Sequence, residues 1–387
     1  MIRIGINALS IIPGAIGGCE IYLSNLLKHL APLVNPQELY VFVNRNSLPV
    51  YQHLQGDKVI IVPVRLDARN RLKRMAYEQL VLPVKAKKLG IGLLFFPTPN
   101  CSLLFPGRNV FALQSLHFFL APHLFSRLKK HTLAVMARLS AKRASRIIAV
   151  SHSVRADAIG LIGVPEERII TIHEGVDYDL FHLPDGNGGD RHAFSGLRQR
   201  FGIRPPYIFS PSSLYSYKNV GPLIEAFSAL YRQHQDLQLV ISGSDWLAEL
   251  ANYQQLCRRL GIARNVIFTG SQPHPVMPYL YHNALCTAYP STLETFGLPI
   301  LESMAAGTPL LVSRAKSAPE IAAGCAVLVD GANAQSIHEG LQQLMDNPGL
   351  RKRLSHAGLE RARHFSWQRT ARETLSLFRA VAAAGGR

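Results

Sequence analysis

Residues 290–309 read PSTLETFGLPILESMAAGTP, and the elements that this stretch predicts decide the fold class. A short apolar run over residues 284–289 precedes it and predicts a buried strand. Pro299 suits the first turn of a helix, because the N–H that proline lacks would have no partner there. A glycine and a proline at the far end of the stretch are helix stop signals. We therefore expect a helix over residues 299–306 and a further strand over residues 308–313.

Two carboxylates flank the predicted start of this helix. Glu294 lies in the loop before it and Glu302 lies one turn inside it. The unpaired N–H groups of the first turn and the helix dipole both favour an anion such as phosphate. A carboxylate beside a phosphate repels it unless the carboxylate accepts hydrogen bonds, so sugar hydroxyls are the natural partners of these side chains. Either glutamate alone would more often be a solvated residue, but together they predict a site for a nucleotide sugar.

The spacing of Glu294 and Glu302, with Phe-Gly-Leu-Pro between them and Met-Ala-Ala-Gly-Thr-Pro after them, resembles the signature of family 4 retaining glycosyltransferases. This resemblance implies an α/β protein of GT-B fold, with two Rossmann-like, doubly wound parallel-sheet domains that face each other across a cleft. It implies that Glu294 contacts the transferred sugar and that Glu302 contacts the ribose. Loop groups that would help to bind the donor are those of Thr295, Phe296, Gly297 and Leu298.

Length and composition agree with two soluble domains. The chain has 387 residues, which is long for a single core, and its apolar fraction is 48%. The five cysteines are odd in number and form no Cys-x-x-Cys pair, so neither a disulfide framework nor a zinc site is indicated. No apolar stretch reaches the roughly 18 residues of a spanning helix. We expect a cytoplasmic protein, with peripheral binding at the inner face of the membrane left open.

The domain boundaries follow from changes in composition and from the resemblance. Residues 1–182 are expected to form an acceptor-binding domain and residues 206–366 a domain that binds the nucleotide sugar. A linker over residues 183–205 separates them, because its first part is rich in Gly, Pro and Asp. By the resemblance, a last helix over residues 367–387 packs back on the first domain.

The positive charge is concentrated in the first domain. The net charge is +17, and residues 63–146 contain sixteen Lys or Arg against two acids. A helix over residues 71–89, interrupted at Pro83, and a second helix over residues 128–144 hold most of this charge. Basic residues beside apolar ones suit an anionic membrane surface, although a solvated helix face explains them at least as well. Nucleic acid is not an expected partner.

A glycine loop follows the first predicted strand, over residues 2–7. Gly17 and Gly18 precede a helix over residues 20–30, and glycines there let the backbone approach a ligand closely. A glycine pair is more often a plain turn. The resemblance, however, implies that Gly17 and Gly18 face the donor diphosphate.

Lys218 and Asn219 stand where a loop enters a helix of the second domain. An ammonium group there can neutralise the charge that builds on a leaving diphosphate. The resemblance implies this role for Lys218, while the arginine that commonly stands five residues earlier is Ser213 here. Two further loops, beginning near Gly243 and Ser271, are expected to frame the base through their backbone.

The acceptor site is expected in the loop after the strand over residues 109–113, because α/β sheets bind ligands at the carboxyl ends of their strands. The family often has His-Asp at this place, where this chain has Gln114 and Ser115. His117 is an alternative, but a histidine beside two phenylalanines is more often a core or loop residue. Gln114 and His117 are the acceptor-site candidates.

These patterns predict a hexosyltransferase-type enzyme with Glu294 and Lys218 as its catalytic residues. It would move a sugar from a GDP- or UDP-linked donor to a glycan or lipid-linked acceptor, for cell-surface polysaccharide synthesis. No metal and no cofactor are expected, because Asp177-Tyr-Asp179 resembles a turn more than a metal motif. The alternatives are a sugar-nucleotide epimerase, a phosphorylase with a pyridoxal lysine and, as an outsider, a basic nucleic-acid-binding protein.

Overall fold

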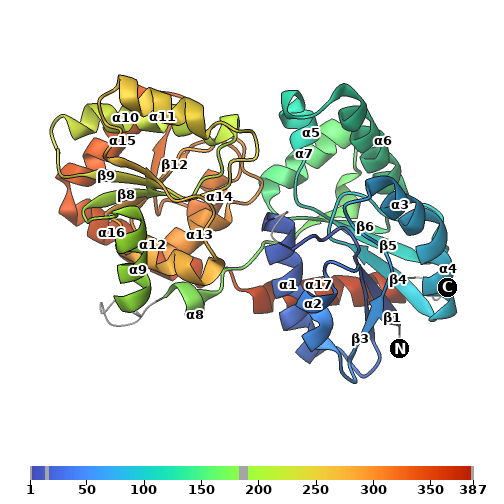
Figure 1. Ribbon diagram of the computed structural model, residues 1–387. Helices are drawn as coiled ribbons and strands as arrows, with labels where there is room; N and C mark the ends of the chain where they lie inside the picture. Colours follow the sequence, from blue (N-terminus) through green and yellow to red (C-terminus); the bar gives the residue numbers. More distant parts are fainter. Residues whose placement is uncertain (1, 14–16, 183–190, 385–387) are drawn as a thin grey trace. The chain divides into compact units, whose positions relative to one another are not determined.

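The structure is a computed structural model that describes residues 2–13, 17–182 and 191–384. The chain divides into two compact units, one formed by residues 1–175 with 367–387 and the other by residues 176–366. Both units consist of a parallel sheet with helices on its faces, so the predicted α/β class with two doubly wound sheets is confirmed (Figure 1). Part of the expected glycine loop, residues 14–16, and the first part of the expected linker, residues 183–190, lie outside the described residues.

The first unit has a seven-stranded sheet of order β3-β2-β1-β4-β5-β6-β7, in which all neighbouring strands are parallel. Its strands are β1 (Arg3–Ala8), β2 (Leu39–Val43), β3 (Val59–Pro63), β4 (Ile91–Phe96), β5 (Arg108–Leu113), β6 (Arg146–Ala149) and β7 (Ile169–Thr171). Its helices are α1 (Gly17–Leu30), α2 (Leu48–Tyr51), α3 (Arg71–Ala76), α4 (Leu82–Lys88), α5 (His117–Leu120), α6 (Arg127–Arg143), α7 (His152–Ile162) and α17 (Trp367–Ala383). The short helical turns are η1 (Ala31–Leu33), η2 (Gln52–Leu54), η3 (Tyr77–Val81), η4 (Pro122–Leu124) and η5 (Glu166–Arg168). The strand order reverses between β1 and β4, so the loops that follow these two strands flank a topological switch point.

The last helix of the chain, α17, belongs to the first unit. It packs beside α1, and its Trp367 ring lies edge-on to the Tyr22 ring at 6.0 Å between centroids. Phe378 of the same helix contacts Phe95 of β4 at 5.2 Å between ring centroids. Both aromatic pairs are buried, so α17 covers part of the first sheet.

The second unit has a six-stranded parallel sheet of order β10-β9-β8-β11-β12-β13. Its strands are β8 (Tyr207–Ser210), β9 (Gln238–Ile241), β10 (Val266–Phe268), β11 (Cys286–Tyr289), β12 (Leu310–Ser313) and β13 (Val327–Val329). Its helices are α8 (Tyr178–Phe181), α9 (Arg191–Phe201), α10 (Val220–Tyr231), α11 (Leu250–Arg259), α12 (Met277–His282), α13 (Leu298–Ala305), α14 (Ala318–Ala322), α15 (Ala334–Asp346) and α16 (Pro348–Ala362). Two short turns, η6 (Ser216–Lys218) and η7 (His274–Val276), lie before α10 and α12.

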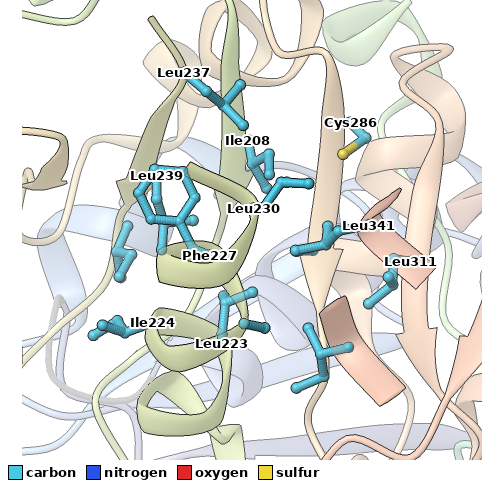
Figure 2. Packing of buried hydrophobic residues seen from close by; sticks show 14 of the residues in the cluster. Ile208, Leu223, Ile224, Phe227, Leu230, Leu237, Leu239, Cys286, Leu311 and Leu341 are labelled. Carbon is cyan, nitrogen blue, oxygen red and sulfur yellow. The ribbon is translucent and has the colours of Figure 1, made fainter. Parts of the chain in front are cut away.

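Helix α10 anchors the core of the second unit. Its Leu223, Phe227 and Leu230 are fully buried against the sheet, where they meet Ile208 of β8 and Leu239 of β9 (Figure 2). The order of the strands reverses between β8 and β11, which places the switch point of this sheet beside α10. The loops that leave β8 and β11 are therefore held by a rigid core.

One predicted element differs from the structure, and a second is interrupted near Pro83 as predicted. The expected linker contains α9, in which Phe194 and Leu197 are buried at helical spacing, so residues 191–201 are a packed helix and not an open connection. The helix expected over residues 71–89 is divided into α3, the π-helical segment η3 and α4. The interruption precedes Pro83, which has no N–H to bond the carbonyl group four residues earlier. No helix in the described part of the chain is both long and apolar enough to cross a membrane.

Candidate functional site

The loop between β11 and α13 is fixed by one glycine and one serine. Gly297 has φ +95°, a conformation that side chains rarely adopt, and a Cβ atom there would lie 2.9 Å from the Ile300 side chain. Ser317 Oγ donates hydrogen bonds to the carbonyl groups of Glu294 and Phe296, at 3.1 and 3.0 Å. Helix α13 begins at Leu298, one residue before the predicted start, so the sequence located this helix start closely.

Lys218 and Glu294 lie in direct contact, one from each loop at the switch point of the second sheet. Lys218 Nζ is 2.5 Å from Glu294 Oε1 and donates a second hydrogen bond to the Tyr289 hydroxyl at 2.6 Å. Tyr289 in turn donates to Glu294 Oε1 at 2.8 Å, which closes a three-membered cluster. The ammonium group also lies over the rings of Tyr217 and Tyr289, at 5.4 and 4.8 Å from their centroids.

This cluster keeps Glu294 charged although it is buried. Burial by itself would raise the pKa of Glu294, but the charge and hydrogen bond of Lys218, with the hydrogen bonds of Ser291 and Tyr289, lower the pKa below its usual value. For Tyr289, burial and then the charge of Glu294 raise the pKa well above its usual value. The site therefore pairs an ammonium with a carboxylate and keeps the phenol neutral.

Glu302 has a different set of partners. The hydroxyl of the fully buried Tyr281 donates to Glu302 Oε2 at 2.7 Å, and His274 Nε2 lies 3.4 Å from Glu302 Oε1. The hydrogen bond with Glu302 raises the pKa of His274, against the opposing effect of its burial. Glu302 also contributes to the raised pKa of Tyr289, so the two glutamates lie in one electrostatic environment. Glu302 is only 7% exposed, which excludes the solvated helix position that a lone glutamate would usually occupy.

Asn219 ties the two loops together. It adopts the left-handed conformation with φ +55°, and its Nδ2 donates to the carbonyl group of Pro290 at 2.8 Å. In the reverse direction, the backbone N–H of Thr292 donates to the carbonyl group of Tyr217 at 2.9 Å. Because its amide group is already engaged, Asn219 is suited to positioning Lys218.

The two loops that were expected to frame the base contain Gly243 and Ser271, and the first of them packs closely against the loop after β8. A Cβ atom on Gly243 would lie 2.2 Å from the Ser212 carbonyl oxygen, so only glycine permits the loops after β8 and β9 to approach this closely. The backbone N–H of Gly243 donates to the carbonyl group of Gly270 at 3.1 Å. Ser271 follows Gly270 and is exposed.

Four candidates belong to the first unit. Gly17 is the first residue of α1, and Gly18 is exposed, with open space where a Cβ atom would lie. Gln114 directly follows β5 and is buried, and its Nε2 has no hydrogen-bond partner among the described residues. Gln114 thus lies at the carboxyl end of a strand, the edge at which α/β sheets bind ligands. His117 begins α5, where its backbone N–H donates to Ser115 Oγ at 3.1 Å.

The aromatic and histidine partners of the two glutamates were not predicted from the sequence. Tyr289 is the last residue of β11 and Tyr281 lies in α12, while His274 lies in η7. Tyr289 stood at the end of a predicted strand, which was a usable signal because strand ends line such sites. Nothing in the sequence indicated that Tyr281 and His274 would meet Glu302, because they lie in an earlier helix and loop.

Two family models match the chain, one for each half. The model described as Glycosyltransferase Family 4 matches residues 16–180, and the model described as Glycosyl transferases group 1 matches residues 197–361. Glu294, Glu302 and Lys218 all lie in the second match. The two matches leave out only the ends of the chain and a short segment between the halves.

Relatives and solved structures of similar length are also found. An uncharacterized glycosyltransferase of Methanocaldococcus jannaschii is 25% identical over 386 residues, covering 95% of both chains. O-antigen chain mannosyltransferase B of Escherichia coli is 25% identical over 274 residues, covering 70% of both chains. The crystal structure of HepE from Anabaena in complex with UDP-glucose is similar with a TM-score of 0.75, at 19% identity, over 98% of this chain and 100% of HepE.

Proposed function

Because this chain is a glycosyltransferase of GT-B fold that resembles family 4, we propose that it retains the anomeric configuration of the sugar that it transfers. The donor would be a nucleoside diphosphate sugar. The acceptor would be a hydroxyl group of a glycan or of a lipid-linked saccharide. This proposal is supported by the fold shared with HepE, which was solved with UDP-glucose, and by the similarity to O-antigen chain mannosyltransferase B.

The observation that carries the proposal is the contact between Lys218 and Glu294. A lysine ammonium has three N–H donors, and Tyr289 and Glu294 accept from two of them. The third has no partner among the described residues and is available to a phosphate oxygen of the donor. Lys218 would then stabilise the negative charge that develops on the departing diphosphate, which is the step that most needs electrostatic help.

The two glutamates would hold the sugars on either side of this diphosphate. Glu294 would accept hydrogen bonds from hydroxyls of the transferred sugar, and Glu302, oriented by Tyr281, from those of the ribose. We place no nucleophilic carboxylate in this scheme. The bond from the sugar to the diphosphate breaks, the acceptor oxygen bonds to the same face, and a phosphate oxygen takes the acceptor proton. Since Lys218 supplies the positive charge, we propose that neither a metal nor a further cofactor takes part.

The proposal is tested with a panel of UDP- and GDP-linked sugars, in which slow hydrolysis identifies the donor. Lys218→Ala should reduce turnover at least about 100-fold, the loss seen when a charge-stabilising donor is removed. Glu302→Gln should weaken donor binding, because an amide accepts fewer hydrogen bonds from the ribose. Lys352→Ala is the matched control, since Lys352 is an exposed lysine of the same unit. Wild-type turnover in both site variants, with folding preserved, would contradict the assignment.

We further propose that a basic and apolar surface of the first unit binds anionic membrane at the cytoplasmic face. Leu72 of α3 and Leu128 of α6 are each 80% exposed, and the exposed Lys73 and Arg127 stand beside them. Exposed leucines next to cations suit insertion between anionic headgroups. The protein should float with vesicles that contain phosphatidylserine, and replacing both leucines by glutamine should abolish flotation. Equal flotation with purely zwitterionic vesicles would contradict the proposed attraction between the basic side chains and anionic lipids.

A further inference from the structure

A small cavity in the first unit contains a cluster of polar groups with no assigned role. Its volume is about 30 Å³, and it lies between residues of α3 and η3 on one side and of α6 on the other. Its polar lining comes from Arg71, Arg74, Glu78, Gln79, Asn100 and Thr132. A cavity of this size accommodates about two water-sized groups. It can therefore take one or two oxygen atoms of a small charged group.

The cavity lies at the switch point of the first sheet. Asn7 of β1 donates from Nδ2 to Glu78 Oε1 at 3.0 Å, and Asn100 is in the loop after β4. These are the two strands between which the strand order reverses. Crevices at such points are where open α/β sheets bind their ligands. The position is thus that of a ligand site of this domain.

Two arginines face this cavity with few partners. Arg74 Nε is buried without a hydrogen bond among the described residues, and the carboxylate oxygen of Glu78 lies 3.9 Å from it, beyond hydrogen-bonding range. No ion pair of Arg71 is found within the described part of the chain. Burial and then the charge of Arg74 lower the pKa of Arg71, as two like charges facing one space require. Burial raises the pKa of Glu78, against the opposing effects of the Arg74 charge and the hydrogen bond from Asn7.

The π-helical turn η3 explains how Glu78 comes to line the cavity. Pro83 cannot bond the carbonyl group of Gln79, and the chain widens into a π turn over Tyr77–Val81. Gln79 is fixed in the next position, since its side chain donates to the carbonyl group of Cys101 at 3.0 Å and accepts from the N–H of Leu103 at 2.8 Å. Such turns are frequent at functional sites. The backbone here is shaped around the cavity.

We propose that this cavity binds an anionic group, a phosphate or a carboxylate, carried by the molecule that receives the sugar. Arg71 and Arg74 would bind the oxygen atoms of that group, with the side-chain amide of Asn100 as a neutral hydrogen-bond donor. The inference rests on the proposed function, since it describes the acceptor of that reaction. The sequence indicated only that the acceptor is a glycan or a lipid-linked saccharide. The cavity adds that this acceptor carries a negative charge.

The test measures NMR line broadening of inorganic phosphate and of acetate on the full-length protein. Wild type should bind at least one of these probes, and Arg71→Gln and Arg74→Gln should each bind it at least tenfold more weakly. The matched control is Arg45→Gln, which removes an exposed arginine of the same unit that does not line the cavity and should bind as wild type does. Binding of phosphate alone identifies a phosphate group, and binding of acetate alone identifies a carboxylate.

Equal binding by all four proteins, or an equal loss in Arg45→Gln, would overturn the proposal. Arg74→Gln also removes a neighbour of Glu78 and so risks misfolding. If that variant fails to fold, anion binding by Arg71→Gln, which leaves Glu78 untouched, tests the proposal. The proposed function is judged separately, by whether wild type hydrolyses a nucleotide sugar. Hydrolysis without arginine-dependent anion binding would overturn the cavity proposal only. Arginine-dependent anion binding without hydrolysis would overturn the proposed function instead.

Discussion

Glu294 and Glu302 are both buried, yet their surroundings give them different properties. Glu294 contacts the ammonium group of Lys218, so its charge is balanced by a full positive charge. Glu302 has the neutral hydroxyl of Tyr281 on one oxygen and the imidazole of His274 near the other. The motif spacing identified both carboxylates. It could not show that Glu294 is paired with a lysine, while Glu302 lies beside a histidine that titrates.

The pairing of His274 with Glu302 predicts a pH dependence of stability. The hydrogen bond of Glu302 raises the pKa of His274 above its ordinary value of about 6.5. A raised folded-state pKa stabilises the protein fully at a pH below about 6.5, and this contribution is lost as the pH rises through the raised value. The effect should stay below about 1 kcal/mol, because the His274 side chain is 37% exposed and the solvent screens the pair.

The measurement compares urea unfolding of wild type and of His274→Gln at about pH 6 and about pH 8.5, on either side of this transition. Wild type should lose more unfolding free energy across this interval than the variant does. Asp177 also faces His274, so Asp177→Asn should reduce the difference by a smaller amount. A variant whose pH dependence equals that of wild type would show that the pair does not contribute.

At the scale of elements, the turn before α13 depends on backbone conformation as much as on side chains. The sequence predicted this helix within one residue, because Pro299 and the glycine at its end are local signals. It could not reveal that Ser317, from the segment before α14, bonds the carbonyl groups of the loop. That contact joins positions more than twenty residues apart and depends on the packing of β12 beside β11.

Gly297→Ala should destabilise the protein by about 1–3 kcal/mol, the cost of a side chain in an unfavourable backbone conformation. The added Cβ would lie 2.9 Å from Ile300 and would shift the loop that contains Glu294. Gly160→Ala is the control, since Gly160 lies exposed in α7 with open space around it and should gain about 0.5–1 kcal/mol. Denaturant unfolding checks both values, and equal stability of the two variants would argue against a special role of Gly297.

At the scale of the whole molecule, the place of α17 in the sequence differs from its place in the fold. Helix α17 follows the entire second unit in sequence but packs in the first, beside α1 and β4. The fold of the first unit is therefore complete only after α17 has been synthesised. Ser366, just before α17, forms an isolated parallel bridge with Val176, so the chain passes between the units twice at neighbouring points.

Phe378→Ala should accordingly destabilise the first unit by about 3–5 kcal/mol, although the residue is near the end of the chain. Its ring is fully buried and lies 5.2 Å from that of Phe95. Limited proteolysis during urea unfolding should show earlier cleavage in the first unit than in the second. Arg372→Ala, at an exposed position of the same helix, should change stability by less than about 0.5 kcal/mol. Equal effects of the two changes would refute the packing role of α17.

The sequence by itself determined the alternation of strands and helices, the positions of Glu294, Glu302 and Lys218, and the resemblance that connects them. These features are local, because apolar periodicity, prolines, glycines and motif spacing act over a few residues. Only the tertiary structure decided that Tyr281 and His274 meet Glu302, that Asn219 ties two loops together, and that Arg71 and Arg74 line one cavity. Such contacts join segments that are far apart in the chain, and they form only once the parallel strands have brought their carboxyl ends to one edge.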